Sequence, residues 1–170
     1  FHWRKYRPKG KNMPLAVTIG WDPVLPSVAS SPVPTGVCEY DIMGALRQEP
    51  VELVKCETVD LEVPASAEIV VERSIDPNPE TFEMEGPFGE WSGYYATGKV
   101  PRAAFRVKSV MHRNNPIIQG NPPSRFPAVW TLGRHIQRSA TVWSELDRQI
   151  PSVKGVWVVE DVNAVSMMVV

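Results

Sequence analysis

The sequence predicts an α+β domain built around an antiparallel or barrel-like sheet. Short apolar runs rich in β-branched residues alternate with loops rich in proline and glycine, which is typical of strands and their connections. Only one segment, residues 130–150, repeats its apolar residues at spacings of three and four over several turns. The 17 prolines among 170 residues exclude a helical bundle through most of the chain.

In the first half of the chain, strands are expected at 14–20, 51–57 and 67–73. Asp22 followed by Pro23 predicts the start of a short helix or turn, with Asp22 as its cap and the proline in the first turn. Residues 39–47 carry apolar side chains at helical spacing. Residues 30–36 and 75–90 are rich in proline and are expected to be loops.

The second half begins with residues 104–112, where apolar residues alternate and predict a strand. A long loop is expected at 114–127, followed by the helix at 130–150, which Pro151 ends. The helix should bury one apolar stripe, made of Leu132, Ile136, Ala140, Trp143, Leu146 and Ile150. Strands are expected at 153–159 and 164–170. The chain starts at Phe1 and stops inside this last apolar run, which reads as a buried strand, so an internal fragment of a longer protein is expected.

Composition and net charge argue against several classes of protein. The net charge of −1 argues against a general nucleic-acid binder. No run of about 18 apolar residues predicts a transmembrane helix. Two cysteines, Cys38 and Cys56, are too few for a disulfide framework and lack zinc-site spacing. They fit a reduced, cytoplasmic setting.

Charge is unevenly distributed along the chain: residues 1–38 carry +4, residues 39–90 carry −11 and residues 91–170 carry +6. The acidic middle has two interpretations. Its carboxylates are either dispersed on a solvated face, or a few of them line a site that needs a proton donor or a metal ligand. The basic start is either a solvated connector or a contact for phosphate or nucleic acid.

The most informative segment is EGPFGEWSG, in which Glu85 and Glu90 flank two glycines and a proline. Glycine and proline disfavour a regular helix or a central strand here, so a shaped loop is expected that can hold both carboxylates toward one point. Two close carboxylates do not both ionise readily, so one of them can serve as a proton donor. The alternative is an acidic surface turn.

Other candidates are weaker. Ser30, Ser31 and Pro32 form a loop whose hydroxyls and backbone donors suit a phosphate. His2, His112 and His135 share no ligand-like spacing, and neither a Ser-His-Asp arrangement nor a glycine-rich nucleotide fingerprint is present.

Taken together, EGPFGEWSGYY, VKCETVDLEVPASAEIVVE, IGWDP and SPVPTGVCEYDIMGALR resemble the UbiD family of decarboxylases. The resemblance extends over essentially the whole chain, and HRNNPIIQG and WVVEDVNAVSMMVV also fit it. It implies a middle domain of split β-barrel, flavin-binding-like fold with flanking helices at 14–170. Residues 1–13 would end an N-terminal region, and the C-terminal oligomerisation region would be missing.

The resemblance also implies an activity. UbiD-like enzymes carry out the non-oxidative, reversible decarboxylation of aromatic or α,β-unsaturated carboxylic acids with prenylated FMN. A flavin prenyltransferase supplies that cofactor, and a homo-oligomer is expected.

Site residues follow from the same resemblance, residue by residue. The family's catalytic constellation is an arginine and two acids, which fall on Glu85 and Glu90. Glu90 would donate the proton, and Glu85 would orient the arginine, which is expected upstream of Phe1. An asparagine metal ligand is also expected upstream, and a flavin-contacting lysine beyond Val170.

The flavin phosphate in this family is held through a divalent metal, usually Mn²⁺, with K⁺ close by. The carboxylate ligand falls on Glu39, a hard oxygen donor. Backbone oxygens near Ala29 and Ser31 would bind K⁺, beside Ser30 and Pro32 in the same cofactor-binding loop.

One departure from the family pattern concerns the metal. The family usually places a histidine ligand three residues after the tryptophan that matches Trp3, and this position is Tyr6 here. A neutral tyrosine is a poor Mn²⁺ ligand because its phenol ionises only near pH 10. Either the metal site is altered, or this subgroup binds the flavin phosphate differently; His2, four residues away, could substitute only if the local backbone allows it.

Two other functions remain open. Tyr6 motivates a non-catalytic UbiD-like subunit or scaffold of a multi-subunit carboxylase, against which the retention of Glu85 and Glu90 argues. Without the resemblance, the chain could be a small β-rich module that binds an anion through its basic start.

Overall fold

The computed structural model describes residues 2–31, 33, 35–90, 93–95, 97–120, 128–159 and 167–170, with backbone only at 129–132. The chain forms two compact units. Unit 1 comprises Phe1–Ala29, Val33–Gly86 and Thr97–Gly120. Unit 2 comprises Ser30–Pro32, Pro87–Ala96 and Asn121–Val170.

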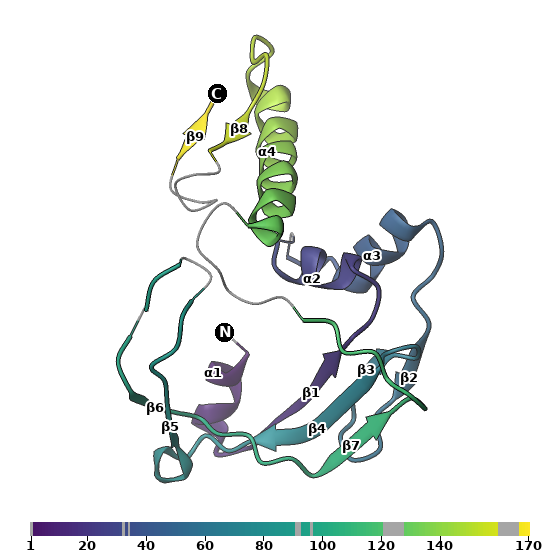
Figure 1. Ribbon diagram of the computed structural model, residues 1–170, viewed down its shortest axis with the longest axis vertical. Helices are drawn as coiled ribbons and strands as arrows, with labels where there is room; N and C mark the ends of the chain where they lie inside the picture. Colours follow the sequence, from purple (N-terminus) through teal and green to yellow (C-terminus); the bar gives the residue numbers. More distant parts are fainter. Residues whose placement is uncertain are drawn as a thin grey trace. The chain divides into compact units, whose positions relative to one another are not determined.

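Unit 1 is organised by a three-stranded antiparallel sheet in the order β1 (Met13–Ile19), β4 (Ile69–Ile75), β7 (Ser109–His112), shown in Figure 1. The central position of β4 follows from its run of branched residues, which suit a strand flanked on both edges. A small core lies over this sheet, consisting of Val63, Ala67 and Val70 with Ala16, Cys56 and Met111 packed against them.

Two hairpins extend unit 1. One pairs β2 (Leu53–Lys55) with β3 (Glu62–Pro64), and the other pairs β5 (Glu83–Glu85) with β6 (Val100–Arg102). The described strands thus form one three-stranded and three two-stranded sheets, and they do not close into a barrel, so the split-barrel expectation is not confirmed.

The prediction of a loop across 75–90 was wrong in part. β4 continues to Ile75, a 3-10 turn η2 (Pro79–Thr81) follows, and β5 then pairs with β6. β6 was not predicted, because Pro101 lacks a backbone donor and argues against a central strand; in a two-stranded hairpin it can occupy an edge.

The helices of unit 1 are α1 (Trp3–Tyr6), the 3-10 turn η1 (Arg7–Lys9), α2 (Val24–Ala29) and α3 (Glu39–Arg47). α3 has the predicted bounds. The N-cap prediction at Asp22 is confirmed, since its Oδ1 accepts a hydrogen bond from the Val24 N–H at 2.9 Å.

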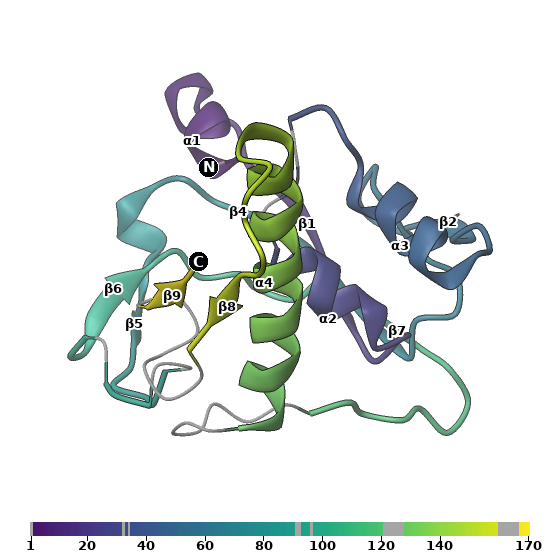
Figure 2. The same ribbon diagram turned by 90° about the horizontal axis from the view of Figure 1, so that it is seen from above.

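Unit 2 contains α4 (Val129–Gln149), β8 (Trp157–Val158) and β9 (Met168–Val169). Figures 1 and 2 both show β8 running beside α4. The Ser139 hydroxyl accepts a hydrogen bond from the Val158 N–H at 3.0 Å, and both residues are buried. No helix within the described residues is long and apolar enough to cross a membrane.

The predicted apolar stripe of α4 is largely not its buried face. His135 and Ser139 are buried, whereas Ile136 and Trp143 remain 64% and 43% exposed. β8 packs on the side that carries Ser139, and this contact, rather than hydropathy, decides which face is covered in this chain.

The other predicted strands are shorter than expected. The strand at 51–57 is reduced to Leu53–Lys55, that at 104–112 to Ser109–His112 and that at 153–159 to Trp157–Val158. The last strand was expected to be buried, but β9 is exposed because only β8 pairs with it. Residues 121–127 of the predicted loop, and 164–166 of the last strand, lie outside the described residues.

Gly20 at the end of β1 gives a first prediction. Its φ is +73°, and a Cβ there would lie 2.6 Å from the Ile117 carbonyl oxygen and 2.8 Å from Glu68 Cγ. We expect Gly20→Ala to destabilise the protein by roughly 1–3 kcal/mol, because both the backbone conformation and the contact become strained. The matched control is Gly98→Ala, whose Cβ meets no atom within 4 Å. Urea unfolding midpoints measure the difference, and equal midpoints for the two variants would contradict the expectation.

Candidate active site

The EGPFGE segment divides between the two units after Gly86. Glu85 ends β5 in unit 1, where it is paired with Val100 of β6. Gly86 follows with φ +83°, a conformation that glycine adopts without a Cβ clash. Glu85 is therefore the end of a strand rather than part of a loop, and the left-handed turn begins at Gly86.

Glu90 lies in a tight turn of unit 2. Its backbone N–H donates to the Tyr94 carbonyl at 3.0 Å, and its carbonyl accepts from the Gly93 N–H at 2.9 Å. A bridge between Gly89 and Tyr95 closes the turn. These backbone bonds fix the position of the Glu90 Cα, while its half-buried side chain has a route to solvent or ligand.

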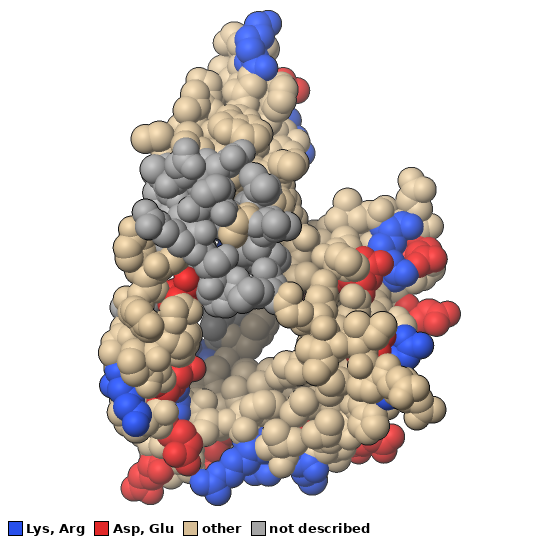
Figure 3. Space-filling view, viewed as in Figure 1, with Lys and Arg blue, Asp and Glu red and all other residues tan. Residues whose placement is uncertain are grey.

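Glu85 has a partner that the sequence did not predict. Arg102 Nε lies 3.5 Å from Glu85 Oε2, and the two side chains are 56% and 52% exposed. The next pair along the hairpin joins Arg106 to Glu83 at 3.7 Å. Figure 3 shows acidic and basic side chains interspersed over this end of unit 1. Such exposed pairs contribute about 0–1 kcal/mol each, so Glu85 is free to exchange Arg102 for another cation.

The segment matched to the cofactor-binding loop connects α2 to α3. Ala29 is the last residue of α2, and Ser30 and Ser31 follow it and are half-buried. Pro32 lies outside the described residues. Glu39 is the first residue of α3, after the N-cap Cys38, and its side chain is exposed. Carbonyl, hydroxyl and carboxylate oxygens are thus the donors in this segment, and this chemistry fits hard cations such as Mn²⁺ and K⁺.

Tyr6 is the half-buried last residue of α1, and His2 is the helix N-cap. The two are four residues apart, which places them on the same side of the helix, one turn from each other. α1 lies by the Met13 end of β1, whereas α2 and α3 lie beyond its Ile19 end (Figure 1). The structure does not bring these residues to Glu39, and no group of three or more histidine, cysteine or acidic side chains that could hold a metal occurs in the described part of the chain.

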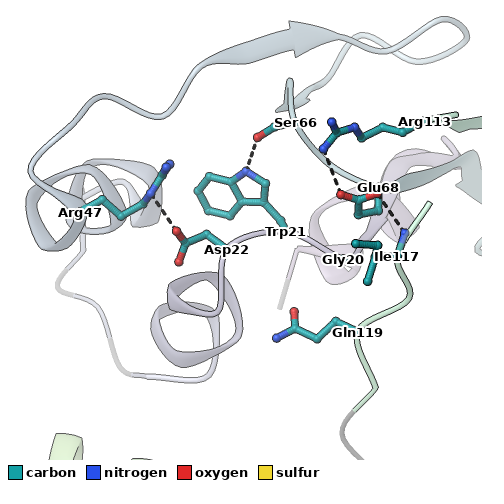
Figure 4. A pocket seen from close by; sticks show the side chains of 9 residues that line it. All are labelled: Gly20, Trp21, Asp22, Arg47, Ser66, Glu68, Arg113, Ile117 and Gln119. Atoms are coloured by element: carbon teal, nitrogen blue, oxygen red, sulfur yellow. Dashed lines mark hydrogen bonds and ion pairs between the residues drawn. The ribbon is translucent and has the colours of Figure 1, made fainter. Parts of the chain in front are cut away.

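A pocket of about 350 Å³ in unit 1 lies beside the start of α2 and the end of α3 (Figure 4). The Trp21 indole N–H donates to the Ser66 hydroxyl at 2.6 Å. Arg47 of α3 stacks over the Trp21 ring at 5.0 Å and pairs with Asp22 at 3.0 Å. Because Asp22 also caps α2, this pairing ties the start of α2 to the end of α3, the two ends of the helix pair that flanks the candidate cofactor segment.

Glu68 forms the other wall of this pocket. Its two carboxylate oxygens accept hydrogen bonds from Arg113 and from the Ile117 N–H, each at 3.0 Å, and its N–H donates to the Gly20 carbonyl at 2.8 Å. Both arginines that line the pocket are therefore paired with carboxylates. Through these contacts, Glu68 holds three segments of unit 1 together.

A buried carboxylate that the sequence analysis did not single out lies in β4. Glu72 is 0% exposed. One oxygen accepts from the Glu57 N–H at 2.9 Å, and the other accepts from the Thr58 N–H at 2.7 Å and the Thr58 hydroxyl at 2.9 Å. Burial raises the pKa of Glu72, but these hydrogen bonds and one from the Val59 N–H outweigh burial and hold the pKa below its ordinary value of 4.5.

The function of Glu72 is to fix the turn between β2 and β3. A signal for it was present in the sequence: Glu72 lies two residues after the core residue Val70, so strand alternation places it on the same face. A carboxylate on a core face needs donors, and the KCET segment supplies them.

The UbiD family model, described as the 3-octaprenyl-4-hydroxybenzoate carboxy-lyase Rift-related domain, matches residues 1–126. The chain thus carries a domain of the carboxy-lyase class. It belongs to the UbiD family, which confirms the resemblance seen in the sequence.

Among curated proteins, the chain is 39% identical to the phenolic acid decarboxylase of Bacillus subtilis over 118 residues, which cover 69% of this chain and 24% of that protein. It is 44% identical over 127 residues to an uncharacterized protein of Aquifex aeolicus, with 72% of this chain and 26% of that protein covered. The chain thus spans about a quarter of the length of these relatives.

Solved structures with a similar fold include a UbiD-class enzyme and a vanillic acid decarboxylase. An evolved dimeric form of the UbiD-class enzyme HmfF from Pelotomaculum thermopropionicum, in complex with prFMN, superposes with a TM-score of 0.85 at 35% identity, covering 98% of this chain and 38% of that one. The vanillic acid decarboxylase ShVdcCD of Sedimentibacter hydroxybenzoicus in open form superposes with a TM-score of 0.81 at 31% identity, covering 92% and 34%.

Proposed function

We propose that this chain is the middle part of a prenylated-FMN-dependent enzyme that reversibly decarboxylates an aromatic or α,β-unsaturated carboxylic acid. The observation that carries the proposal is the EGPFGE turn, which keeps both Glu85 and Glu90 in a chain whose fold matches the HmfF complex with prFMN. The names of the vanillic and phenolic acid decarboxylases support an aromatic acid as the substrate class.

Each residue of the turn has a role in this proposal. Glu90 holds a proton on its carboxyl and delivers it to the substrate carbon that has lost carbon dioxide. Glu85 orients an arginine, and its exposed pairing with Arg102 shows that a guanidinium fits beside it. When bound, prenylated FMN supplies the electron sink for the departing carboxyl group.

The residues proposed to hold the cofactor are Ala29, Ser30, Ser31, Pro32 and Glu39. Glu39 would bind Mn²⁺ beside the flavin phosphate, and oxygens near Ala29 and Ser31 would bind K⁺. Their oxygen donors suit these ions. The position of the remaining ligand is Tyr6 here, so the metal site is altered, or the flavin phosphate is bound differently, or His2, one helical turn away, substitutes.

A second function is favoured by Tyr6 alone. A UbiD-like subunit that has lost its metal histidine could act as a scaffold in a multi-subunit carboxylase. Retention of Glu85 and Glu90 argues against this alternative, since a scaffold has no use for a proton donor.

The test uses the full-length protein co-expressed with a flavin prenyltransferase. We expect visible flavin absorbance, the intact mass of prenylated FMN and bound manganese in the same sample. We also expect release of carbon dioxide from at least one of vanillate-like, hydroxybenzoate-like, cinnamate-like or polyprenyl-hydroxybenzoate acids. A flavin-loaded protein inactive on all of them would overturn the decarboxylase proposal. A protein without flavin would favour the scaffold.

A further inference from the structure

A second pocket of unit 1, of about 290 Å³, is lined by residues to which the proposed decarboxylase assigns no role. They are Thr58, Val59, Arg73, Ser74 and Lys108. None of them belongs to the EGPFGE turn or to the segment from Ala29 to Glu39.

The pocket lies at the point where β7 ends, so that β4 continues with β1 as its only neighbour. The ladder between β4 and β7 ends at the pair Glu72–Ser109, and one more bond joins the Lys108 N–H to the Glu72 carbonyl at 3.1 Å. β4 continues past this point through Arg73 and Ser74, which pair with β1 only. An opening is left beside them, at the side of β4 that β7 no longer covers.

The two cations of this pocket have no ion-pair partner among the described residues. Neither Arg73 nor Lys108 forms an ion pair or a side-chain hydrogen bond with any described residue, although Arg73 is half-buried. The Ser74 hydroxyl has no partner among the described residues either. Four other arginines of the same unit do pair with carboxylates, namely Arg47, Arg102, Arg106 and Arg113.

Nearby carboxylates do not neutralise the pocket. Glu72 lies behind Thr58 and its oxygens accept from the Glu57 and Thr58 donors, so it forms no ion pair with Arg73 or Lys108. Glu57 and Asp60 belong to the same turn, but their side chains are exposed and neither residue lines the pocket. Two positive groups without an ion-paired carboxylate, Arg73 from the acidic stretch 39–90 and Lys108 from the basic stretch 91–170, therefore line one small opening.

We propose that Arg73 and Lys108 form a binding site for a phosphate-type oxyanion, either free phosphate or the phosphate of a small monoester. A guanidinium can donate two parallel hydrogen bonds to such a group. The ammonium of Lys108 adds a mobile point charge. Through Thr58, the site adjoins the turn that Glu72 holds, so its occupancy stabilises the family's KCET segment.

The test is calorimetric titration of the full-length, flavin-loaded protein, in which the cofactor already occupies its own phosphate site. Inorganic phosphate and adenosine monophosphate are the two probes, at constant ionic strength. We expect saturable binding that weakens about tenfold or more in Arg73→Met and in Lys108→Met, because each removes a charge-assisted contact. Lys55→Met is the matched control, since it removes one positive charge from exposed strand β2 outside the pocket.

Arg73→Lys separates charge from geometry and should retain part of the affinity, with an unchanged circular dichroism spectrum. Tighter binding of the nucleotide identifies a phosphate monoester as the ligand, and equal binding identifies free phosphate. Absence of saturable binding by both probes would overturn the proposal. So would a loss of affinity in Arg73→Met and Lys108→Met no larger than that in Lys55→Met.

Discussion

Glu90→Gln in the full-length protein is expected to lower the turnover number by roughly 10²–10⁴-fold, because an amide cannot deliver the proton that a carboxylic acid delivers. Flavin content should stay unchanged, since the backbone bonds to Gly93 and Tyr94 that fix the turn do not involve the Glu90 side chain. The measurement pairs the decarboxylation rate with the flavin absorbance of the same sample after gel filtration.

Glu39→Ala provides the contrasting variant. It is expected to lose flavin during gel filtration, because the proposed metal bridge to the flavin phosphate would lack its carboxylate ligand. If Glu90→Gln also lost its flavin, the assignment of Glu90 as the proton donor would be wrong. Retention of flavin and metal in Glu39→Ala would remove Glu39 from the metal site.

Glu72→Gln is expected to lower the free energy of unfolding by about 2–4 kcal/mol at pH 7, since it replaces charge-assisted hydrogen bonds from Glu57 and Thr58 in a buried site. Hydrogen exchange at these two amides should accelerate in the variant. Glu62→Gln is the control: it removes a carboxylate from an exposed position of β3 and should change stability by less than about 0.5 kcal/mol.

The pH dependence of the Glu72 effect has a defined sign. The pKa of Glu72 is lower in the folded protein than its ordinary value of 4.5, so the ionised carboxylate stabilises the fold fully above that value. The contribution is lost as the pH falls through the folded-state pKa. Urea unfolding at pH 7 and at successively lower pH should therefore show the difference between wild type and Glu72→Gln narrowing below about pH 4.5. A difference that stays constant across this range would contradict the proposed role of the charge.

Local signals in the sequence predicted most of the helices and their ends. The bounds of α3 match, α4 was predicted to within one residue at each end, and Asp22 caps α2 as expected. Each of these features depends on residues within one or two turns of each other, so the sequence carries the information directly.

Pairing between distant segments was predicted less well. β5 and β6 are 15 residues apart, and their register places Arg102 diagonally across from Glu85, within 3.5 Å of its carboxylate, which neither segment indicates alone. The face of α4 that is buried likewise depends on where β8 packs. Such contacts form through tertiary packing, which overrides local patterns.

The sequence by itself determined the family, through motifs whose residue types and spacing are specific, and it placed Glu85, Glu90 and Glu39 as candidates for the chemistry. Only the tertiary structure decided which charged side chains have hydrogen-bond or ion-pair partners. It placed Glu72 among the donors of the β2–β3 turn and left Arg73 and Lys108 without a carboxylate beside one pocket. The physical reason is that burial and ion pairing depend on strand register and on where a sheet ends, and these are set by contacts between residues far apart in the chain.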